Sequence, residues 1–475
     1  MTPPSPRPGS LGSFRPEVGD VRRLLALAAP VALVQVGMMF MGAVDTVMVG
    51  RVSAVDLAAV ALGNLYVFGA ITFGMGTLFS LDPVISQSVG ARDEAGVALG
   101  VQRGMVMSLG LFILSALLLF PAGPVLSFLR QPADVVPVAE GYALASIPGV
   151  FPFFAFIVLR QSLQAMGRVA PIVITVLAAN VVNVVLNWIL IFGHLGFPAM
   201  GAVGSGWATT LGRWFMVFGL LGLAWGELHR SLWPLHSGAG RLQPLLRLLR
   251  LGAPIGFQQF LEFGVFGAAG MFMGWMGTVA MAAHQVALNM AALTFMVPVG
   301  IAQAASVLVG HAVGRDDPPG ARRAAGAGLV VGVLFMSGTA AMFLLFPEGL
   351  ARLYSDEGAV VVLAATLVPI AGVFQVFDGL QVVGSGVLRG VGDTRVPMLI
   401  NLVGFWFIGL PLSGYLGFLA GVGPQGVWWG LAAGLALVAV LLLARVRHHF
   451  GRELRRLVID EAPEAARRGG DHEPG

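Results

Sequence analysis

The chain has 475 residues, of which 57% are hydrophobic and only 11% are charged. A water-soluble domain usually carries about a quarter charged residues, so this composition excludes an ordinary soluble protein and predicts one embedded in a lipid bilayer. The net charge is +4 at pH 7, all 28 basic residues are arginine, and cysteine is absent. Without lysine there is no P-loop and no Schiff base, and without cysteine there is no disulfide or thiolate metal site.

Twelve apolar segments follow one another along the chain. Each is long enough to cross the roughly 30 Å hydrocarbon layer as a helix. We therefore predict twelve transmembrane helices, at residues 24–50, 56–88, 97–120, 135–162, 169–193, 199–226, 246–276, 279–313, 319–346, 358–388, 396–418 and 425–446.

The second half of the chain repeats the first. Pro30 is matched by Pro254, and the loop at 89–93 is matched by the loop at 313–317, with the same shift along the chain in both cases. Internal duplication is typical of secondary transporters, in which two similar bundles move around one central site. The sequence thus predicts an all-α polytopic membrane protein, with its twelve helices in two pseudo-symmetric six-helix bundles.

The repeat also divides the chain into domains. The proline-rich start lacks the apolar core of a signal peptide and is expected to be disordered. Near the other end, apolar residues spaced among arginines predict either a short amphipathic helix on the inner leaflet or a frayed, solvated tail. We expect a disordered N-terminal tail at 1–20, an N-lobe at 21–226, a cytoplasmic linker at 227–245, a C-lobe at 246–446 and a cytoplasmic tail at 447–475.

Arginine is distributed unevenly between the loops. Only Arg51, Arg130, Arg213 and Arg352 lie outside the two tails, the alternate loops that begin with 90–96, and the flanking helix ends. The positive-inside rule then predicts that both termini are cytoplasmic.

Three carboxylates fall inside predicted spans: Asp45, Glu262 and Asp378. An ionisable side chain at the centre of a membrane helix costs about 2.5–3.5 kcal/mol on insertion scales, so acids kept there are candidate functional residues. In the fifth span Asn180, Asn183 and Asn187 line one helix face. Their carbonyl oxygens suit a hard cation or the proton of a buried acid.

Side chains at helical spacing from each acid extend these candidate sites. Methionines give a deformable wall suited to varied ligands, and aromatic rings attract cations. The alternative is that these groups only hold helices together or fill the core. The neighbours are Phe374, Gln381 and Ser385 for Asp378, Gln258 and Phe266 for Glu262, and Met38, Met41 and Met48 for Asp45.

The remaining polar residues of the spans are weaker candidates. His284 and Gln285 start the eighth span and are possible neighbours of Glu262, whereas Arg213 is assigned no role. Three further charged residues lie toward helix ends, where we expect water nearby and no function: Asp82, Glu140 and Arg160.

Several runs of residues carry a family resemblance. The sequence MGAVDTVMVGR at 41–51 and the runs at 201–209 and 388–394 resemble the MATE (multidrug and toxic compound extrusion) transporters. With the repeat, the resemblance covers about residues 20–446. Acids in both lobes make the chain similar to the bacterial NorM-type branch.

The resemblance implies a V-shaped pair of bundles in the bacterial cytoplasmic (inner) membrane. Such a protein exports organic cations and drugs through alternating access, in antiport with Na⁺ or H⁺. It is not an enzyme, and we expect a monomer surrounded by lipid, without a cofactor or a nucleic-acid partner.

The resemblance also implies which residues act. An asparagine stands where related branches place a second acid in the fifth span, which shifts the expected cation coupling to Glu262 and Asp378, with Na⁺ as one possible ion there. The expected N-lobe coupling residues are Asp45, Asn183, Asn187 and Thr209, and the expected substrate-binding residues are Asp45, Met38, Met41, Phe295, Phe374, Gln258 and Gln381.

Two other carrier classes are alternatives. A major-facilitator carrier would show a Gly-x-x-x-Asp-Arg loop after the second span, whereas residues 90–94 read GARDE. A flippase for lipid-linked or polysaccharide precursors would need arginines inside its cavity, and only Arg213 is available.

Overall fold

The computed structural model describes residues 11–460, and every regular element in that range is a helix. The first half contains η1 (Leu11–Phe14), α1 (Val18–Val49), α2 (Ala54–Leu78), α3 (Leu81–Gly90), α4 (Glu94–Leu119), α5 (Ala122–Phe128), α6 (Val136–Ser146), η2 (Ile147–Gly149), α7 (Val150–Ala165), α8 (Ala170–Phe192), α9 (Gly201–Leu223) and α10 (Trp225–Leu232). The second half contains α11 (Leu242–Trp275), α12 (Thr278–Gly314), α13 (Pro318–Leu345), α14 (Pro347–Arg352), α15 (Gly358–Gly390), α16 (Arg395–Asn401), η3 (Leu402–Gly409), α17 (Leu410–Gly414), η4 (Tyr415–Leu419) and α18 (Pro424–Phe450).

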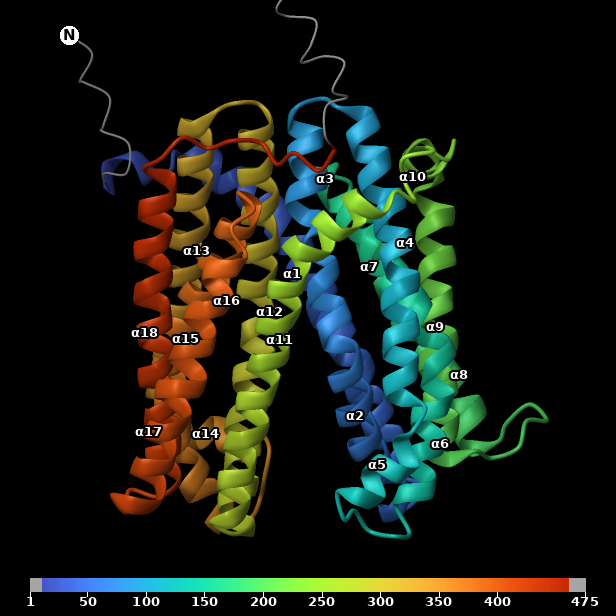
Figure 1. Ribbon diagram of the computed structural model, residues 1–475. Helices are drawn as coiled ribbons and strands as arrows, with labels where there is room; N and C mark the ends of the chain where they lie inside the picture. Colours follow the sequence, from blue (N-terminus) through green and yellow to red (C-terminus); the bar gives the residue numbers. More distant parts are fainter. Residues whose placement is uncertain (1–10, 461–475) are drawn as a thin grey trace, which may run out of the picture.

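Two bundles stand side by side, with most of their helices running along a shared direction (Figure 1). We call α1–α10 the N-lobe and α11–α18 the C-lobe. Between residues 11 and 460, ten helical stretches are long and apolar enough to cross a membrane, and the bent pair α9 and α10 makes an eleventh. Helix α11 is 34 residues long but carries Gln258, Gln259 and Glu262, which make it less apolar. The predicted all-α multi-pass membrane fold is confirmed.

The duplication is visible in the backbone. Asp93 caps α4 by accepting a hydrogen bond from the Gly96 N–H at 2.8 Å, and Asp317 caps α13 by accepting one from the Gly320 N–H at 2.9 Å. The two caps are the last residues of the matched loops found in the sequence. A side-chain oxygen in this position satisfies a free N–H of the first helical turn. The two lobes therefore start their third long helices in the same way.

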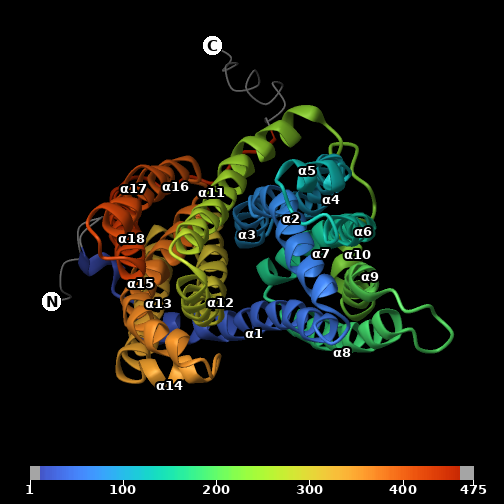
Figure 2. The ribbon, with the colours of Figure 1, turned by 90° about the horizontal axis from the view of Figure 1, so that it is seen from below.

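The first long helix of each half crosses between the lobes. Leu24 and Val31 of α1 pack in the C-lobe core, whereas Val34 and Met41 further along α1 pack in the N-lobe core. Leu248 at the start of α11 packs in turn against the N-lobe. Figure 2 shows α1 running from the C-lobe to α8 and α11 running the opposite way. The two lobes are thus joined where these helices begin.

The lobes pack tightly at the end that holds the α3–α4 and α12–α13 loops, which we call the closed end. There α2 packs on α11, and α3 packs on α12. The Gln87 amide donates a hydrogen bond to the Gly390 carbonyl at 2.9 Å, and His311 contacts the Ala165 carbonyl at 2.7 Å. A Cβ on Gly252 would lie 2.2 Å from the Thr77 carbonyl oxygen. Only glycine permits so close a backbone approach.

Two connecting segments differ from expectation. The linker predicted at 227–245 begins inside α10, and α11 already starts at Leu242. After α18 ends at Phe450, residues 451–460 form neither the amphipathic helix nor a frayed tail. They form an ordered strap without regular secondary structure that crosses the closed end from the C-lobe to the N-lobe (Figure 1).

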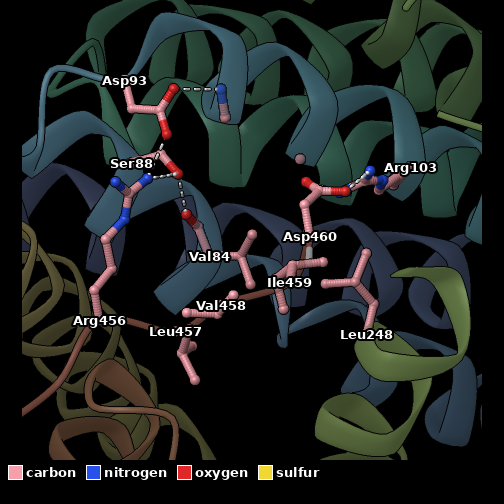
Figure 3. A pocket seen from close by; sticks show the side chains of 12 residues that line it. Val84, Ser88, Asp93, Arg103, Leu248, Arg456, Leu457, Val458, Ile459 and Asp460 are labelled. Atoms are coloured by element: carbon pink, nitrogen blue, oxygen red, sulfur yellow. Dashed lines mark hydrogen bonds and ion pairs between the residues drawn. The ribbon is translucent and has the colours of Figure 1, made fainter. Parts of the chain in front are cut away.

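Side-chain contacts fix this strap to the N-lobe (Figure 3). Arg456 donates to Asp93 at 2.6 Å and to Ser88 at 3.2 Å, and Asp460 pairs with Arg103 at 2.6 Å. Burial alone would raise the pKa of Asp93, but bonds from the Gly96 N–H and from Arg456 outweigh it and lower that pKa. The helical spacing of apolar residues in this segment is misleading, because Gln87 and Arg247 bond the backbone of Leu457 and Ile459 instead.

The close approach at Gly252 gives a test of the closed end. We expect Gly252→Ala to destabilise the protein by about 1–3 kcal/mol, because the new methyl group must displace backbone. The matched control is Gly338→Ala in α13, where a Cβ meets no atom within 4 Å. Unfolding of both variants in detergent measures the difference, and equal stability of the two would contradict the described packing.

Candidate functional site

A large cavity of about 1130 Å³ lies between the lobes. Its walls come mainly from the second half of α11 and the first half of α12, with α15 behind them and the start of α2 across from them. These segments lie away from the closed end (Figure 1). The cavity therefore belongs to the end where the two lobes diverge.

Glu262 and Asp378 both line this cavity. The Gln258 amide donates to Glu262 Oε1 at 3.3 Å, and the Gln381 amide donates to the same oxygen. Among residues 11–460 no donor reaches Glu262 Oε2 or the Asp378 carboxylate. These two acids, predicted from separate helices, thus face one space with oxygens left for a proton or a cation.

Aromatic rings form the wall beside the acids. Phe295 and Phe374 line the cavity, as the sequence predicts, and Phe374 is itself only 2% exposed. Its ring meets Phe266 at 6.1 Å and Trp428 at 5.7 Å in edge-on contacts. Phe374 therefore both packs the C-lobe core and borders the cavity. His284 and Gln285 line the same cavity.

Behind Glu262 lies a chain of amides. Gln381 donates at 2.9 Å to Asn401, whose own amide donates at 2.9 Å to the Pro397 carbonyl. Asn401 is completely buried. The sequence interpretation missed Asn401 and Trp428, although an isolated asparagine within an apolar span is a detectable signal. These linked amides hold the Gln381 side chain in place and so orient its hydrogen bond to Glu262.

The N-lobe holds a separate polar cluster around Asp45. Asp45 accepts a hydrogen bond from the Asn187 amide at 2.6 Å and from the Thr209 hydroxyl at 2.9 Å. The Asn187 amide also donates to Asn183 at 3.1 Å. Asp45, Asn183 and Asn187 are at most 3% exposed. The four residues expected to form the N-lobe site are therefore in contact, and both carboxylate oxygens have a donor.

Other residues expected near Asp45 pack in the N-lobe or join its helices. Met41 is 7% exposed and packs in the N-lobe core, and the Met38 sulfur lies 3.6 Å from the Arg160 guanidinium. Asn180 donates to the Gly37 carbonyl at 3.0 Å and ties α8 to α1. Asp45 and these methionines are not among the lining residues of the large cavity. The structure thus keeps the N-lobe candidates apart from those of the C-lobe.

The expectation that Asp82 and Arg160 lie near water is wrong. Their exposed fractions are 3% and 2%, because α3 and α7 are covered at the closed end. Asp82 lies 3.4 Å from Arg389 on α15 and so forms an ion pair between the lobes. Arg160 donates to Gln35 at 2.8 Å. Glu140, by contrast, is partly exposed.

Arg213 lies near the Asp45 cluster. Its guanidinium carbon is 4.8 Å from the centre of the Phe153 ring, a cation–π distance. One guanidinium nitrogen, Nη1, is buried and has no hydrogen-bond partner among the described residues. Arg213 is not among the residues that line the large cavity.

Two internally similar bundles of apolar helices, with two acids facing the cavity between them, have the architecture of a secondary membrane transporter. The MatE family model matches the chain twice, at residues 30–189 and 254–414. The chain belongs to the MatE family. The first match begins at Pro30 and the second at Pro254, the pair of prolines that first marked the repeat.

Individual relatives agree with this assignment. The chain is 35% identical to multidrug resistance protein NorM of Photobacterium profundum over 434 residues, which cover 90% of this chain and 95% of that protein. It is 36% identical to multidrug resistance protein PmpM of Pseudomonas aeruginosa over 469 residues, which cover 94% and 96%. These relatives place the chain with the NorM-type MATE transporters.

Solved structures share the fold. The eukaryotic MATE transporter AtDTX14 superimposes with a TM-score of 0.85 at 23% identity, covering 93% of this chain and 99% of that one. An outward-facing multidrug resistance MATE transporter of the MOP superfamily gives a TM-score of 0.82 at 18% identity, covering 94% and 99%.

The Asp45 cluster gives a test by exchange of partners. Asn187→Ala removes the shorter of the two hydrogen bonds to the buried Asp45 carboxylate and is expected to cost about 1–3 kcal/mol of stability. The double exchange Asp45→Asn with Asn187→Asp restores one amide beside one carboxylate, so it should recover most of that loss. Unfolding in detergent measures both variants. A double exchange less stable than Asn187→Ala would show that the cluster depends on charge at position 45 specifically.

Proposed function

We propose that this protein exports organic cations and drugs in antiport with Na⁺ or H⁺, through alternating access of the two lobes. The names of the NorM and PmpM relatives, both multidrug resistance proteins, support drugs as substrates. The observation that carries the proposal is a large cavity with aromatic and methionine walls that also contains two carboxylates.

The cavity chemistry fits a lipophilic cation. Phe295 and Phe374 supply ring faces, which attract a cation by roughly 0.5–2 kcal/mol. Met271 and Met281 supply flexible, polarizable surface that adapts to different shapes. No arginine is among the described lining residues, which favours a cationic substrate over the pyrophosphate of a lipid-linked sugar.

Coupling follows from competition for the same acids. A proton or Na⁺ bound to Glu262 and Asp378 neutralises the charge that holds the drug. The incoming ion therefore displaces the drug, which then leaves the cavity. The two ligands drive antiport when they favour opposite-facing conformations of the lobes. Glu262 Oε2 and Asp378, which accept no hydrogen bond from the described residues, are the atoms we assign to the coupling ion. Asp45 with Asn183, Asn187 and Thr209 then supports the N-lobe and its drug contacts.

The proposed orientation places the closed end in the cytoplasm of a bacterial cell, with the chain in its inner membrane. Arginines gather in the loops and strap of that end, for example Arg92, Arg315 and Arg456, as the positive-inside rule requires. The described cavity then lies on the outer side, where a drug leaves. We propose that one chain suffices, because the cavity is built from the two lobes of a single chain.

The C-lobe acids can be tested by removing charge alone. We expect the double variant Glu262→Gln with Asp378→Asn to lose gradient-driven drug efflux from proteoliposomes down to the rate of protein-free vesicles. Both changes are nearly isosteric, so folding should persist.

The matched control is Asp356→Asn with Glu357→Gln, which makes the same chemical changes at exposed positions before α15. Each protein is assayed under separately imposed Na⁺ and pH gradients. Normal efflux by the Glu262 and Asp378 double variant would move the coupling site elsewhere.

A further inference from the structure

A second, smaller pocket opens at the closed end of the C-lobe. It occupies about 440 Å³, and its walls contain four arginines, Arg247, Arg250, Arg395 and Arg445, from α11, α16 and α18. Asp393 is the only acid among the described lining residues. We call it the arginine pocket.

The charges in the arginine pocket are not balanced internally. Asp393 is already engaged, because Arg445 donates to it at 2.7 Å and His449 lies 3.5 Å away. Arg247 donates at 2.9 Å to the Ile459 carbonyl of the strap. Arg250 and Arg395 are both exposed, and no acid within residues 11–460 pairs with either. Two guanidinium groups are thus left for an anion.

A hydrogen bond joins the two segments that carry these arginines. The Thr394 hydroxyl donates at 2.8 Å to the Leu251 carbonyl, which ties the start of α16 to α11. Arg395 directly follows Thr394, and Arg250 directly precedes Leu251. Because the bond joins the neighbours of both residues, the fold brings the backbones of Arg250 and Arg395 to the same pocket.

Exposed leucines flank both arginines along their helices. Leu249, 38% exposed, directly precedes Arg250 on α11, and Leu399, 51% exposed, follows Arg395 by one helical turn. Leu457 and Ile459 of the strap line the pocket itself. A ligand with a phosphate group and hydrocarbon chains matches this combination, since basic pockets between membrane helices on the cytoplasmic side suit anionic lipid headgroups.

From these observations we propose that the arginine pocket binds the phosphate of an anionic phospholipid, held by Arg250 and Arg395. Its glycerol and acyl chains lie along Leu249 and Leu399. Because Arg247 and the strap form one wall, the bound lipid also braces the strap in its place across the closed end. This site is separate from the export cavity and does not depend on which ion drives export.

The test measures lipid binding by native mass spectrometry of the purified full chain. Short-chain phosphatidylglycerol is the probe, with phosphatidylcholine of equal chain length and inorganic phosphate as comparison ligands. An arginine near an anionic surface contributes ~1 kcal/mol to binding, and about 1.4 kcal/mol corresponds to a tenfold change in affinity. The double variant Arg250→Gln with Arg395→Gln should therefore weaken phosphatidylglycerol binding about 30-fold. Each single variant should weaken it about fivefold, which keeps the test valid if the double variant folds poorly.

The control is Arg230→Gln with Arg315→Gln, two exposed arginines of the same end outside the pocket. It should bind phosphatidylglycerol like the unmodified chain. Equal weakening in the control pair, or unchanged binding in the pocket variants, would overturn the site. Binding of inorganic phosphate as tight as that of phosphatidylglycerol would overturn the assignment to a lipid. The drug-efflux assay tests the proposed function separately, and its result does not depend on any of these lipid-binding outcomes.

Discussion

A carboxylate inside a membrane helix bundle must be neutralised by a proton, a cation or close hydrogen-bond donors, and both lobes are organised around this constraint. The two lobes meet it differently. In the N-lobe, Asn187 and Thr209 donate to the two oxygens of Asp45. In the C-lobe, both donors to Glu262 reach a single oxygen, and the described residues supply none to Asp378. The acid whose two oxygens both accept hydrogen bonds is therefore in one lobe, and the acids with unpaired oxygens among the described residues are in the other.

The closed end has to come apart if access is to alternate. The α1 and α11 helices cross between the lobes there, and Asp82 pairs with Arg389 across the buried interface. A buried ion pair gives little net stability, since desolvation opposes the attraction. The Gln161 and Gln303 side chains are also buried without hydrogen-bond partners in the described chain. Water reaching these groups on opening would offset part of the cost of separating the lobes, as the proposed alternating access requires.

The sequence predicts those features of the fold and of the candidate site that depend on composition and on the spacing of residues. The repeated loops of the two halves appear in the structure as equivalent caps at Asp93 and Asp317. Glu262 and Asp378 stand out because a charge in an apolar span is conspicuous, and they do share a cavity. Contacts between distant segments are different. Nothing local marks Asp82 as the partner of Arg389, because its burial comes from packing of one lobe on the other.

The strap shows the same limit. Its apolar residues recur at helical spacing among arginines, which favours a surface helix. In the structure, however, Leu457 donates its backbone N–H to Gln87 at 2.8 Å and Arg456 pairs with Asp93. These partners lie in the other lobe, beyond the reach of a periodicity argument. The methionines near Asp45 were likewise interpreted as a cavity wall, whereas Met41 packs in the N-lobe core.

The division of labour between the lobes is the central claim, and direct binding of the coupling cation tests it. Binding of radiolabelled Na⁺, and proton release on adding drug, are measured on the purified protein and on its Asp45→Asn and Asp378→Asn variants side by side. The unmodified protein exchanges one of the two cations. The account predicts that the Asp45→Asn variant still exchanges this cation and that the Asp378→Asn variant does not. Loss of that exchange in Asp45→Asn alone would contradict it and place the coupling ion in the N-lobe.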